Sequence, residues 1–233
     1  MIPADEPITI SQPHSLELNA ERLLLSQGAD PDIVKARRPK VYQLAQQAVE
    51  TGLTLIEPHV WKKMLRVERF RHERFDLEGG FTLQGRLPAE VLAGSEWVFI
   101  AMGTLGLRLE EAIHAEMAQD AAWGYMLDAF GSAAADHLAE QLMAEARWQA
   151  EKAGENVSTP LMLGHANWRV DEGQPQLFSI LQPDSSILRL TESSLMYPRK
   201  SFSLVLGLGH MQPGGSLCES CDLNATCPMR KNR

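Results

Sequence analysis

The order of apolar and polar positions divides the chain into a helical first part, a strand-rich middle and a second helical stretch. Leucines at 16–24 precede a turn at 27–32, and from Ile33 to Thr51 apolar side chains recur about every 3.6 residues, so we expect this part to be helical. Gly52 is expected to end this part. From Leu53 onward, apolar and charged residues alternate in the segments 53–58, 64–77 and 81–85, and this alternation predicts half-buried antiparallel strands.

A nearly continuous apolar segment further along predicts a strand that is buried on both faces. It spans residues 95–106 and ends in a glycine turn that leads into a helix beginning near Arg108. Residues 108–153 carry the longest helical pattern, which predicts two helices that meet near Ala121. The remaining elements are expected as a loop at 158–168, a helix at 174–181, and strands at 185–193 and 200–209 joined by a turn at Pro198 and Arg199.

The balance of charge excludes some classes of partner. The chain has 233 residues, of which 44% are hydrophobic and 22% charged, and its formal net charge is −8. Phosphate affinity needs clustered Lys and Arg, and the basic run 66–74 is interleaved with Glu68 and Glu73, so we expect no nucleic-acid partner. The N-terminal residues lack a basic segment followed by an apolar one, and no stretch reaches about 18 consecutive apolar residues. We therefore expect a cytoplasmic protein with no membrane partner.

Common catalytic signatures are incomplete or missing. Gly103-x2-Gly106 lacks the third glycine of a dinucleotide fingerprint and the Gly-Lys-Ser/Thr of a phosphate loop, so we interpret it as a turn. The second long helix contains a run of small residues, 131–135, which favours close packing of another backbone or of a flat ligand. Asp136 and Glu140 follow it one helical turn apart, where they would form either a ligand-binding pair of carboxylates or a solvated stripe.

All three cysteines lie close together near the C-terminus. Cys218-x2-Cys221-x5-Cys227 can direct three thiolates toward one ion, as structural zinc sites do, and His210 would be the fourth ligand. Three cysteines alone would instead suit an iron–sulfur cluster with one open iron. A redox pair or a tail of free thiols is the plainer alternative. A reducing compartment fits cysteines used as ligands, and the odd count points the same way.

The order of segments resembles a known family. The run YMLDAFGSAAADHLAEQL, the loop LGHANW, the helix QPQLFSIL, the block LRLTESSLMYPRKSFSLVLGLG and the cysteine tail are similar to the activation domain of vitamin-B12-dependent methionine synthase. They are most similar to its free-standing bacterial versions, which also carry C-terminal cysteines. The most specific part is residues 190–203, with the pattern L-T-E-S-x2-M-x-P-x2-S-x-S. On this basis we expect a tail at 1–15, an activation-domain-like domain at 16–209 and a Cys-rich tail at 210–233.

This resemblance implies both a fold and a role. The fold would be a single α+β domain with a twisted antiparallel sheet flanked by helices, a helical N-terminal part and a long central helix. The family binds S-adenosylmethionine and supplies its methyl group when a cobalamin that has become inactive is reductively remethylated. The implied partners are a corrinoid-binding protein or other methionine synthase modules, with a flavodoxin-like electron donor. The protein would be an accessory of methyltransferase activity and not a complete catalyst.

The family's binding residues carry over only in part. Asp136 stands where the family has an acidic residue that contacts the methyl donor, and Glu140 lies one turn further on. The family loop Arg-x3-Gly-Tyr reads here from Pro160 to His165, so only Gly164 is kept and the arginine that pairs with the donor's carboxylate is absent. Arg169 is the nearest replacement cation. The resemblance thus implies a donor site at Asp136, Glu140, Gly164, His165 and Arg169.

Two hypotheses of different classes follow. In the first, the protein binds S-adenosylmethionine and assists a corrinoid methyltransferase. In the second, the scaffold is kept but donor binding is lost, and a zinc ion or iron–sulfur cluster at Cys218, Cys221 and Cys227 makes the protein an adaptor or electron relay. A cluster with an open iron that itself holds the donor would join the two hypotheses, although the cysteine spacing differs from that of radical enzymes that bind the donor in this way.

Overall fold

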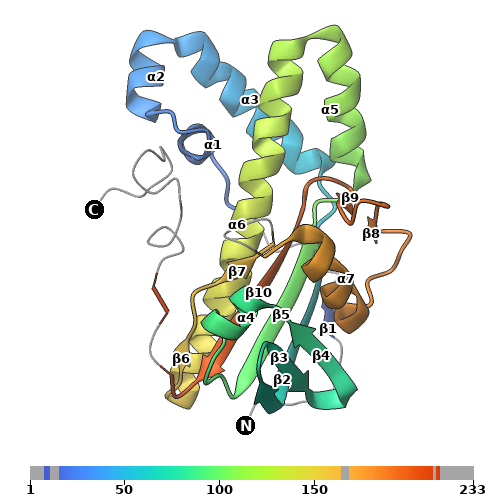
Figure 1. The fold of residues 1–233 in the computed structure, drawn as a ribbon. Helices are drawn as coiled ribbons and strands as arrows, with labels where there is room; N and C mark the ends of the chain where they lie inside the picture. Colours follow the sequence, from blue (N-terminus) through green and yellow to red (C-terminus); the bar gives the residue numbers. More distant parts are fainter. Residues whose placement is uncertain (1–7, 11–15, 164–167, 212–213, 216–233) are drawn as a thin grey trace.

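An antiparallel sheet with one very long helix laid along its face organises the chain (Figure 1). The computed structural model describes residues 8–10, 16–163, 168–211 and 214–215. The helices are α1 (Ala20–Ser26), α2 (Pro31–Arg37), α3 (Pro39–Leu55), α4 (Arg86–Val91), α5 (Leu107–Gln119), α6 (Ala121–Ala153) and α7 (Val170–Leu181). The strands are β1 (Ile8–Ile10), β2 (His59–Arg71), β3 (Arg74–Leu77), β4 (Phe81–Gln84), β5 (Trp97–Thr104), β6 (Asn156–Val157), β7 (Leu161–Met162), β8 (Arg189–Leu190), β9 (Met196–Tyr197) and β10 (Ser201–Gly209).

The sheet is antiparallel throughout and centred on β5. Its order is β4-β3-β2-β5-β10-β6, and β1 and β7 add short pairings to β2 and β10. Strands β8 and β9 form a separate two-stranded sheet. The predicted α+β class, with a helical N-terminal part and a long central helix, is confirmed. Within the described residues, no helix is long and apolar enough to cross a membrane.

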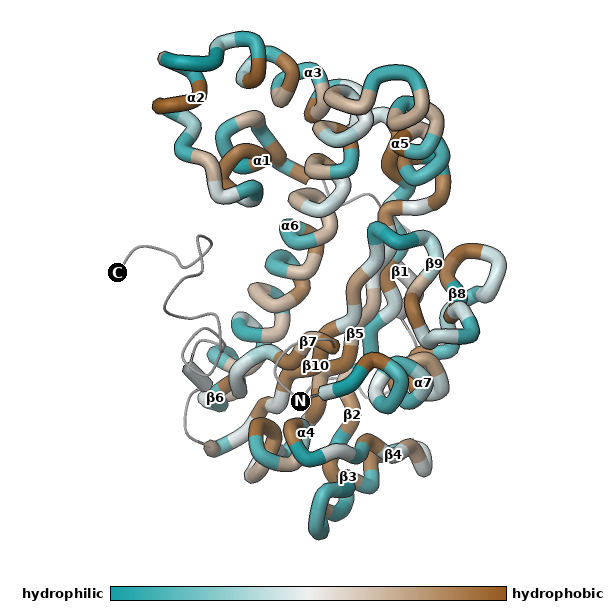
Figure 2. Tube along the Cα trace, turned by 45° about the horizontal axis from the view of Figure 1, so that its top comes forward, coloured by the Kyte–Doolittle hydropathy of each residue, from teal (hydrophilic) through white to brown (hydrophobic). Residues whose placement is uncertain are grey.

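Each face of the sheet is covered by its own apolar core. In β5, Phe99 and Ala101 belong to the core formed with α1, α3, α5 and α6, whereas Val98, Ile100 and Met102 belong to the core formed with α7. This arrangement explains the unbroken apolar run at this strand, because neither face meets water. Figure 2 shows the hydrophobic positions concentrated on the central strands, with hydrophilic positions on the outer turns of the helices.

Helix α6 is continuous for 33 residues. It begins where Asp120 accepts hydrogen bonds from the backbone N–H groups of Ala122 and Trp123, and it ends at Gly154 in the left-handed conformation. The predicted junction of two helices near Ala121 is confirmed. The small residues 131–135 let the helix approach the sheet closely, since a Cβ on Gly131 would lie only 3.0 Å from the Lys200 side chain. The run of small residues therefore serves helix packing.

The sequence prediction is wrong at Gly52 and in the segment after it. Helix α3 continues through Gly52 to Leu55, so the strand expected at 53–58 does not form. Gly52 is required by packing, because a Cβ there would lie 2.3 Å from the ring of Phe130 on α6. A glycine in this helix thus marks a close contact between helices and not a helix end.

Other boundaries also differ from the prediction. The single strand expected at 64–77 is the hairpin of β2 and β3, which turns at His72 and Glu73, and a short turn at Glu78–Gly80 joins β3 to β4. The strand expected at 185–193 is reduced to β8, which pairs with β9. Consequently the turn at Pro198 and Arg199 leads from one sheet to the other instead of joining paired strands. Short elements near prolines and serines lack the periodicity that would reveal them.

Candidate ligand pocket

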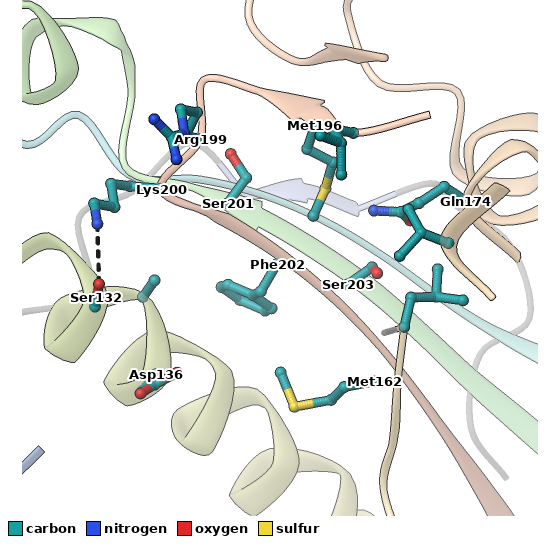
Figure 3. A pocket seen from close by; sticks show the side chains of 14 residues that line it. Ser132, Asp136, Met162, Gln174, Met196, Arg199, Lys200, Ser201, Phe202 and Ser203 are labelled. Carbon is teal, nitrogen blue, oxygen red and sulfur yellow. Dashed lines mark hydrogen bonds between the residues drawn. The ribbon is translucent and has the colours of Figure 1, made fainter. Parts of the chain in front are cut away.

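A pocket of about 460 Å³ lies beside the first residues of β10, between α6 and the N-terminal half of α7. This volume is within the range of small-molecule sites, which is about 300–1,000 Å³. Figure 3 shows Asp136 and Ser132 on one side, Arg199, Lys200 and Gln174 on others, and Phe202 between them. The lining residues are Ser132, Ala135, Asp136, Met162, Leu163, Val170, Gln174, Leu195, Met196, Arg199, Lys200, Ser201, Phe202 and Ser203.

The pairing of β10 explains why the sheet is open at this point. On one side of β10, every residue except Gly209 pairs with β5. On the other side, β10 pairs with β7 only at Leu204 and Val205, and with β6 only at Leu208 and Gly209. In the described structure, Ser201–Ser203 therefore have no strand partner on the pocket side. An unpaired edge offers backbone donors and acceptors to a ligand.

Of the two cationic side chains at this edge, Lys200 is paired with a carboxylate, and Arg199 has no ion pair among the described residues. The Lys200 ammonium donates to Ser132 Oγ at 2.9 Å and pairs with Asp128 at 2.8 Å, and its side chain is only 14% exposed. Arg199 is exposed, and its backbone N–H donates to the carboxylate of Glu110. Within the described residues the guanidinium of Arg199 has no ion pair. Lys200 thus ties β10 to α6, whereas the guanidinium of Arg199 is available to an anion.

Gln174 is a buried polar side chain whose hydrogen bonds are incomplete. It lies on α7, lines the pocket and is 3% exposed, yet its Oε1 has no hydrogen-bond partner among the described residues. Buried amide oxygens are normally paired, because an unpaired one costs about 1–3 kcal/mol. A hydrogen-bond donor that reached this oxygen after a rotation of the amide would remove this cost. Gln174 therefore gives the pocket a polar wall on the side of α7.

The apolar part of the pocket depends on a glycine of β5. Phe202 projects into the space between α6 and β7, and a Cβ on Gly103 would lie 2.5 Å from its ring. The interpretation of Gly103-x2-Gly106 as a turn is therefore wrong for Gly103, which is a strand residue that makes room for an aromatic side chain. Gly106, with a φ of +84°, is the turn residue that precedes α5.

The residues predicted as a donor site are separated by the structure. Asp136 lines the pocket, whereas the carboxylate of Glu140, one turn along α6, pairs with Arg22 of α1. Arg169 precedes α7 and is engaged by Asp171 and Glu172, and its hydrogen bonds hold the pKa of the Asp171 carboxyl below its usual value. Neither Glu140 nor Arg169 lines the pocket.

The other predicted residues are placed only in part. Gly164 and His165 lie outside the described residues, although Leu163 and Val170 on either side of them line the pocket. Cys218, Cys221 and Cys227 also lie outside the described residues. His210 is described, and its Nδ1 lies 3.1 Å from Glu96 Oε1.

Arg199, Lys200 and Gln174 were missed as site residues by the sequence reasoning. The signal was present for two of them, since Arg199 and Lys200 lie within the block 190–203 that is the most specific part of the family resemblance. No sequence pattern indicated Gln174 as a site residue, because a lone glutamine at the start of a helical pattern is ordinarily solvated.

Comparison with solved structures finds a protein of similar fold. The chain matches the MetH reactivation domain, whose crystal structure has AdoHcy bound, with a TM-score of 0.62 over 86% of this chain and 79% of the other. The sequence identity is 12%, so the likeness concerns the fold alone. No family model matches the sequence, and no curated protein matches it. The predicted resemblance is thus confirmed for the fold.

Proposed function

We propose that this protein binds S-adenosylmethionine in the pocket beside β10 and serves as an activation module for a corrinoid-dependent methyltransferase. The observation that carries the proposal is a pocket lined by Asp136, Arg199 and Gln174, whose buried Oε1 has no hydrogen-bond partner in the part of the chain that the structure describes. The resemblance in fold to a reactivation domain bound to AdoHcy supports the choice of ligand. The fold alone would not assign the function.

The charges around the pocket suit a zwitterion. Asp136 on α6 would bind the ligand's ammonium group, and Arg199 would bind its carboxylate through the two parallel N–H groups of a guanidinium. In this proposal Arg199 takes the part of the family's loop arginine, at whose position this chain has Pro160. The cation would then reach the ligand from the sheet edge instead of from the loop.

The remaining walls suit a flat heterocycle. Phe202, Met162 and Met196 provide apolar and polarisable surface, and Gln174 Oε1 would accept a hydrogen bond from an exocyclic amino group such as that of adenine. When bound, S-adenosylmethionine supplies an activated methyl group. The residues of this chain bind and orient the ligand, and the methyl acceptor would be the cobalt of a partner's corrinoid. A corrinoid-carrying module and a flavodoxin-like electron donor are the partners that this role requires.

Calorimetric titration with two ligands tests the proposal. S-adenosylhomocysteine has the amino-acid part, whereas 5′-methylthioadenosine lacks it. We expect the first to bind more tightly, and Asp136→Asn to weaken its binding by about tenfold or more without changing the binding of the second. Glu151→Gln, at an exposed position on the same helix, is the matched control. The proposal is wrong if neither ligand nor S-adenosylmethionine gives measurable heat.

Glu140, Gly164, His165 and Arg169 remain predictions for the same site. Glu140→Gln and Arg169→Gln test two of them in the same titration, and their effects should be smaller than that of Asp136→Asn because neither residue lines the pocket. Both variants also break ion pairs, with Arg22 and with Asp171, so thermal stability is measured alongside binding.

The spacing of the three cysteines favours a second candidate function, that of a metal-carrying adaptor or electron relay. We propose a zinc ion or an iron–sulfur cluster at Cys218, Cys221 and Cys227. An anaerobic preparation analysed by absorption spectrum and elemental content should contain zinc or iron in a defined ratio to protein. A colourless preparation without either metal would refute this candidate and leave the pocket proposal unaffected.

A further inference from the structure

A second group of ligand-type side chains gathers at the far end of β10. Glu96 lies just before β5, Glu155 just after α6 and His210 just after β10, and one donor atom from each lies within 4.8 Å of the other two. The His210 Nδ1 to Glu96 Oε1 distance is already 3.1 Å. Imidazole and carboxylate are common ligands of zinc and related metals. We propose that Glu96, Glu155 and His210 bind a divalent transition-metal ion, independently of the pocket and of the cysteines.

The backbone holds these three residues firmly in place. The N–H of Glu96 donates to the carbonyl of Leu208 at 2.8 Å, and its own carbonyl accepts from Val67 at 2.8 Å. Glu155 follows the left-handed Gly154, and the next residue, Asn156, pairs with Gly209 of β10. The side chain of Asn156 also donates to the carbonyl of Met211 at 2.6 Å, on the far side of His210. Three separate segments are thereby fixed around one point, as a metal site requires.

Gly209 permits this close approach. Its φ is +154°, and a Cβ there would lie 2.9 Å from the backbone nitrogen of Glu96. A side chain at this position would push the end of β10 away from Glu96. The glycine therefore allows His210 to come within hydrogen-bonding distance of the Glu96 carboxylate.

The local charge favours a cation. Two carboxylates lie side by side, and within the described ranges neither is paired with a lysine or arginine. Glu155 Oε2 is buried and has no hydrogen-bond partner among the described residues. Adjacent carboxylates repel one another, and a buried carboxylate oxygen without a donor is costly. A metal ion between the three groups would relieve both penalties.

The geometry also indicates how tightly the ion would be held. Ligand atoms stand about 2.0–2.2 Å from zinc, so two of them cannot be more than about 4.4 Å apart, and only small side-chain rotations would be needed. The side chains of His210 and Glu96 are 72% and 56% exposed, so the ion would exchange readily with solvent. When bound, it would cross-link the ends of α6 and β10 to the start of β5.

Zinc titration of the full chain carrying Cys218→Ser, Cys221→Ser and Cys227→Ser tests the proposal without thiolate ligands. We expect one zinc ion to bind per chain by calorimetry and to raise the unfolding temperature by several degrees. Adding His210→Ala or Glu155→Gln should weaken this binding by about tenfold or more. The matched controls His114→Ala and Glu151→Gln, at exposed helix positions, should bind zinc normally. His210→Ala is the safer variant for folding because that side chain is mostly exposed.

Each alternative outcome would overturn the proposal. Zinc binding by the native chain but not by the cysteine-free chain would assign the metal to the cysteines. Binding that persists in the His210→Ala and Glu155→Gln chains would show non-specific association. The absence of zinc binding to the cysteine-free chain would leave only a hydrogen-bonding contact between His210 and Glu96. None of these results bears on ligand binding in the pocket.

Discussion

The two ends of β10 differ in the charged groups around them, because both signs gather at the pocket end whereas two carboxylates and an imidazole gather at the other. The end that begins at Ser201 follows Arg199 and Lys200, whereas the end at Gly209 lies beside Glu96, Glu155 and His210. The residues between them are buried in the two cores. At about 3.4 Å per residue, the eight steps of this strand separate the two groups by about 27 Å. We expect the two ends of β10 to bind chemically different ligands, and we expect binding at one end to leave the affinity at the other end unchanged.

Gly103→Ala should have the largest effect, because it destabilises the folded protein next to the pocket and so also weakens ligand binding there. The added Cβ would lie 2.5 Å from the Phe202 ring, and overpacking of this kind costs about 1–3 kcal/mol. We expect a lower urea midpoint and weaker binding of S-adenosylhomocysteine. Adding Phe202→Leu should restore part of the stability, since the smaller side chain relieves the clash. An unchanged midpoint in the single variant would contradict the packing described for this end.

Arg199→Gln should have the largest effect on the pocket with the fold left intact. The loss of a charge-assisted hydrogen bond costs about 1.5–3 kcal/mol, which corresponds to about 10- to 100-fold weaker binding of S-adenosylhomocysteine. Binding of 5′-methylthioadenosine should not change, because this ligand lacks the carboxylate. Arg199→Lys should be intermediate, since an ammonium cannot form the paired contact. Equal losses for both ligands would show that Arg199 does not recognise the carboxylate.

Arg199→Gln also tests whether ligand binding at one end of β10 is independent of zinc binding at the other. Zinc affinity should be the same in the Arg199→Gln chain as in the native chain, and ligand affinity should be the same in the His210→Ala chain. A change of more than about twofold in either crossed measurement would mean that the strand transmits an effect between its ends.

Lys200→Met should have a moderate effect, on stability more than on binding. It removes the hydrogen bond to Ser132 and the ion pair with Asp128, whose side chain is 43% exposed. Because solvent screens this pair, we expect a loss of about 1 kcal/mol in urea unfolding. Ligand affinity should fall less than in the Arg199→Gln chain. A larger fall in affinity would assign the carboxylate to Lys200.

The sequence predicted the elements with strong periodicity and missed contacts between distant segments. The buried strand β5 and the pair α5 and α6 were recognised because their apolar patterns are long. Gly52 and Gly103 were misread because each is required by an aromatic ring far away in sequence, Phe130 and Phe202. A single sequence carries no sign of such a partner.

The residues of the candidate sites were also predicted only in part from the sequence. Asp136 was found from the family resemblance and lines the pocket, but the separation of Glu140 from it depends on Arg22 in α1, which no local pattern reveals. His210 was singled out as a metal ligand, whereas its neighbours Glu96 and Glu155 were not, because they reach it only through the pairing of β10 with β5 and β6.

The smallest expected effect is a pH dependence on the face of α6 that is turned away from the pocket. Burial lowers the pKa of His137 below its ordinary value of about 6.5, helped by Arg22 and opposed by Glu140 and Glu17. The unfolded chain therefore binds a proton at this position more readily than the folded one. This contribution to stability is complete above about pH 6.5 and is lost as the pH falls from there toward the lowered pKa.

Urea unfolding at pH 7.5 and 5.5 measures this effect, and His137→Gln should reduce the difference between the two midpoints. The imidazole Nδ1 is buried without a hydrogen-bond partner among the described residues, so a proton added there would have no acceptor among them. Because the effect acts through the folded state as a whole, it should lower the stability of both ends of β10 together. A pH change that altered only ligand binding or only zinc binding would instead arise from groups at that end of the strand.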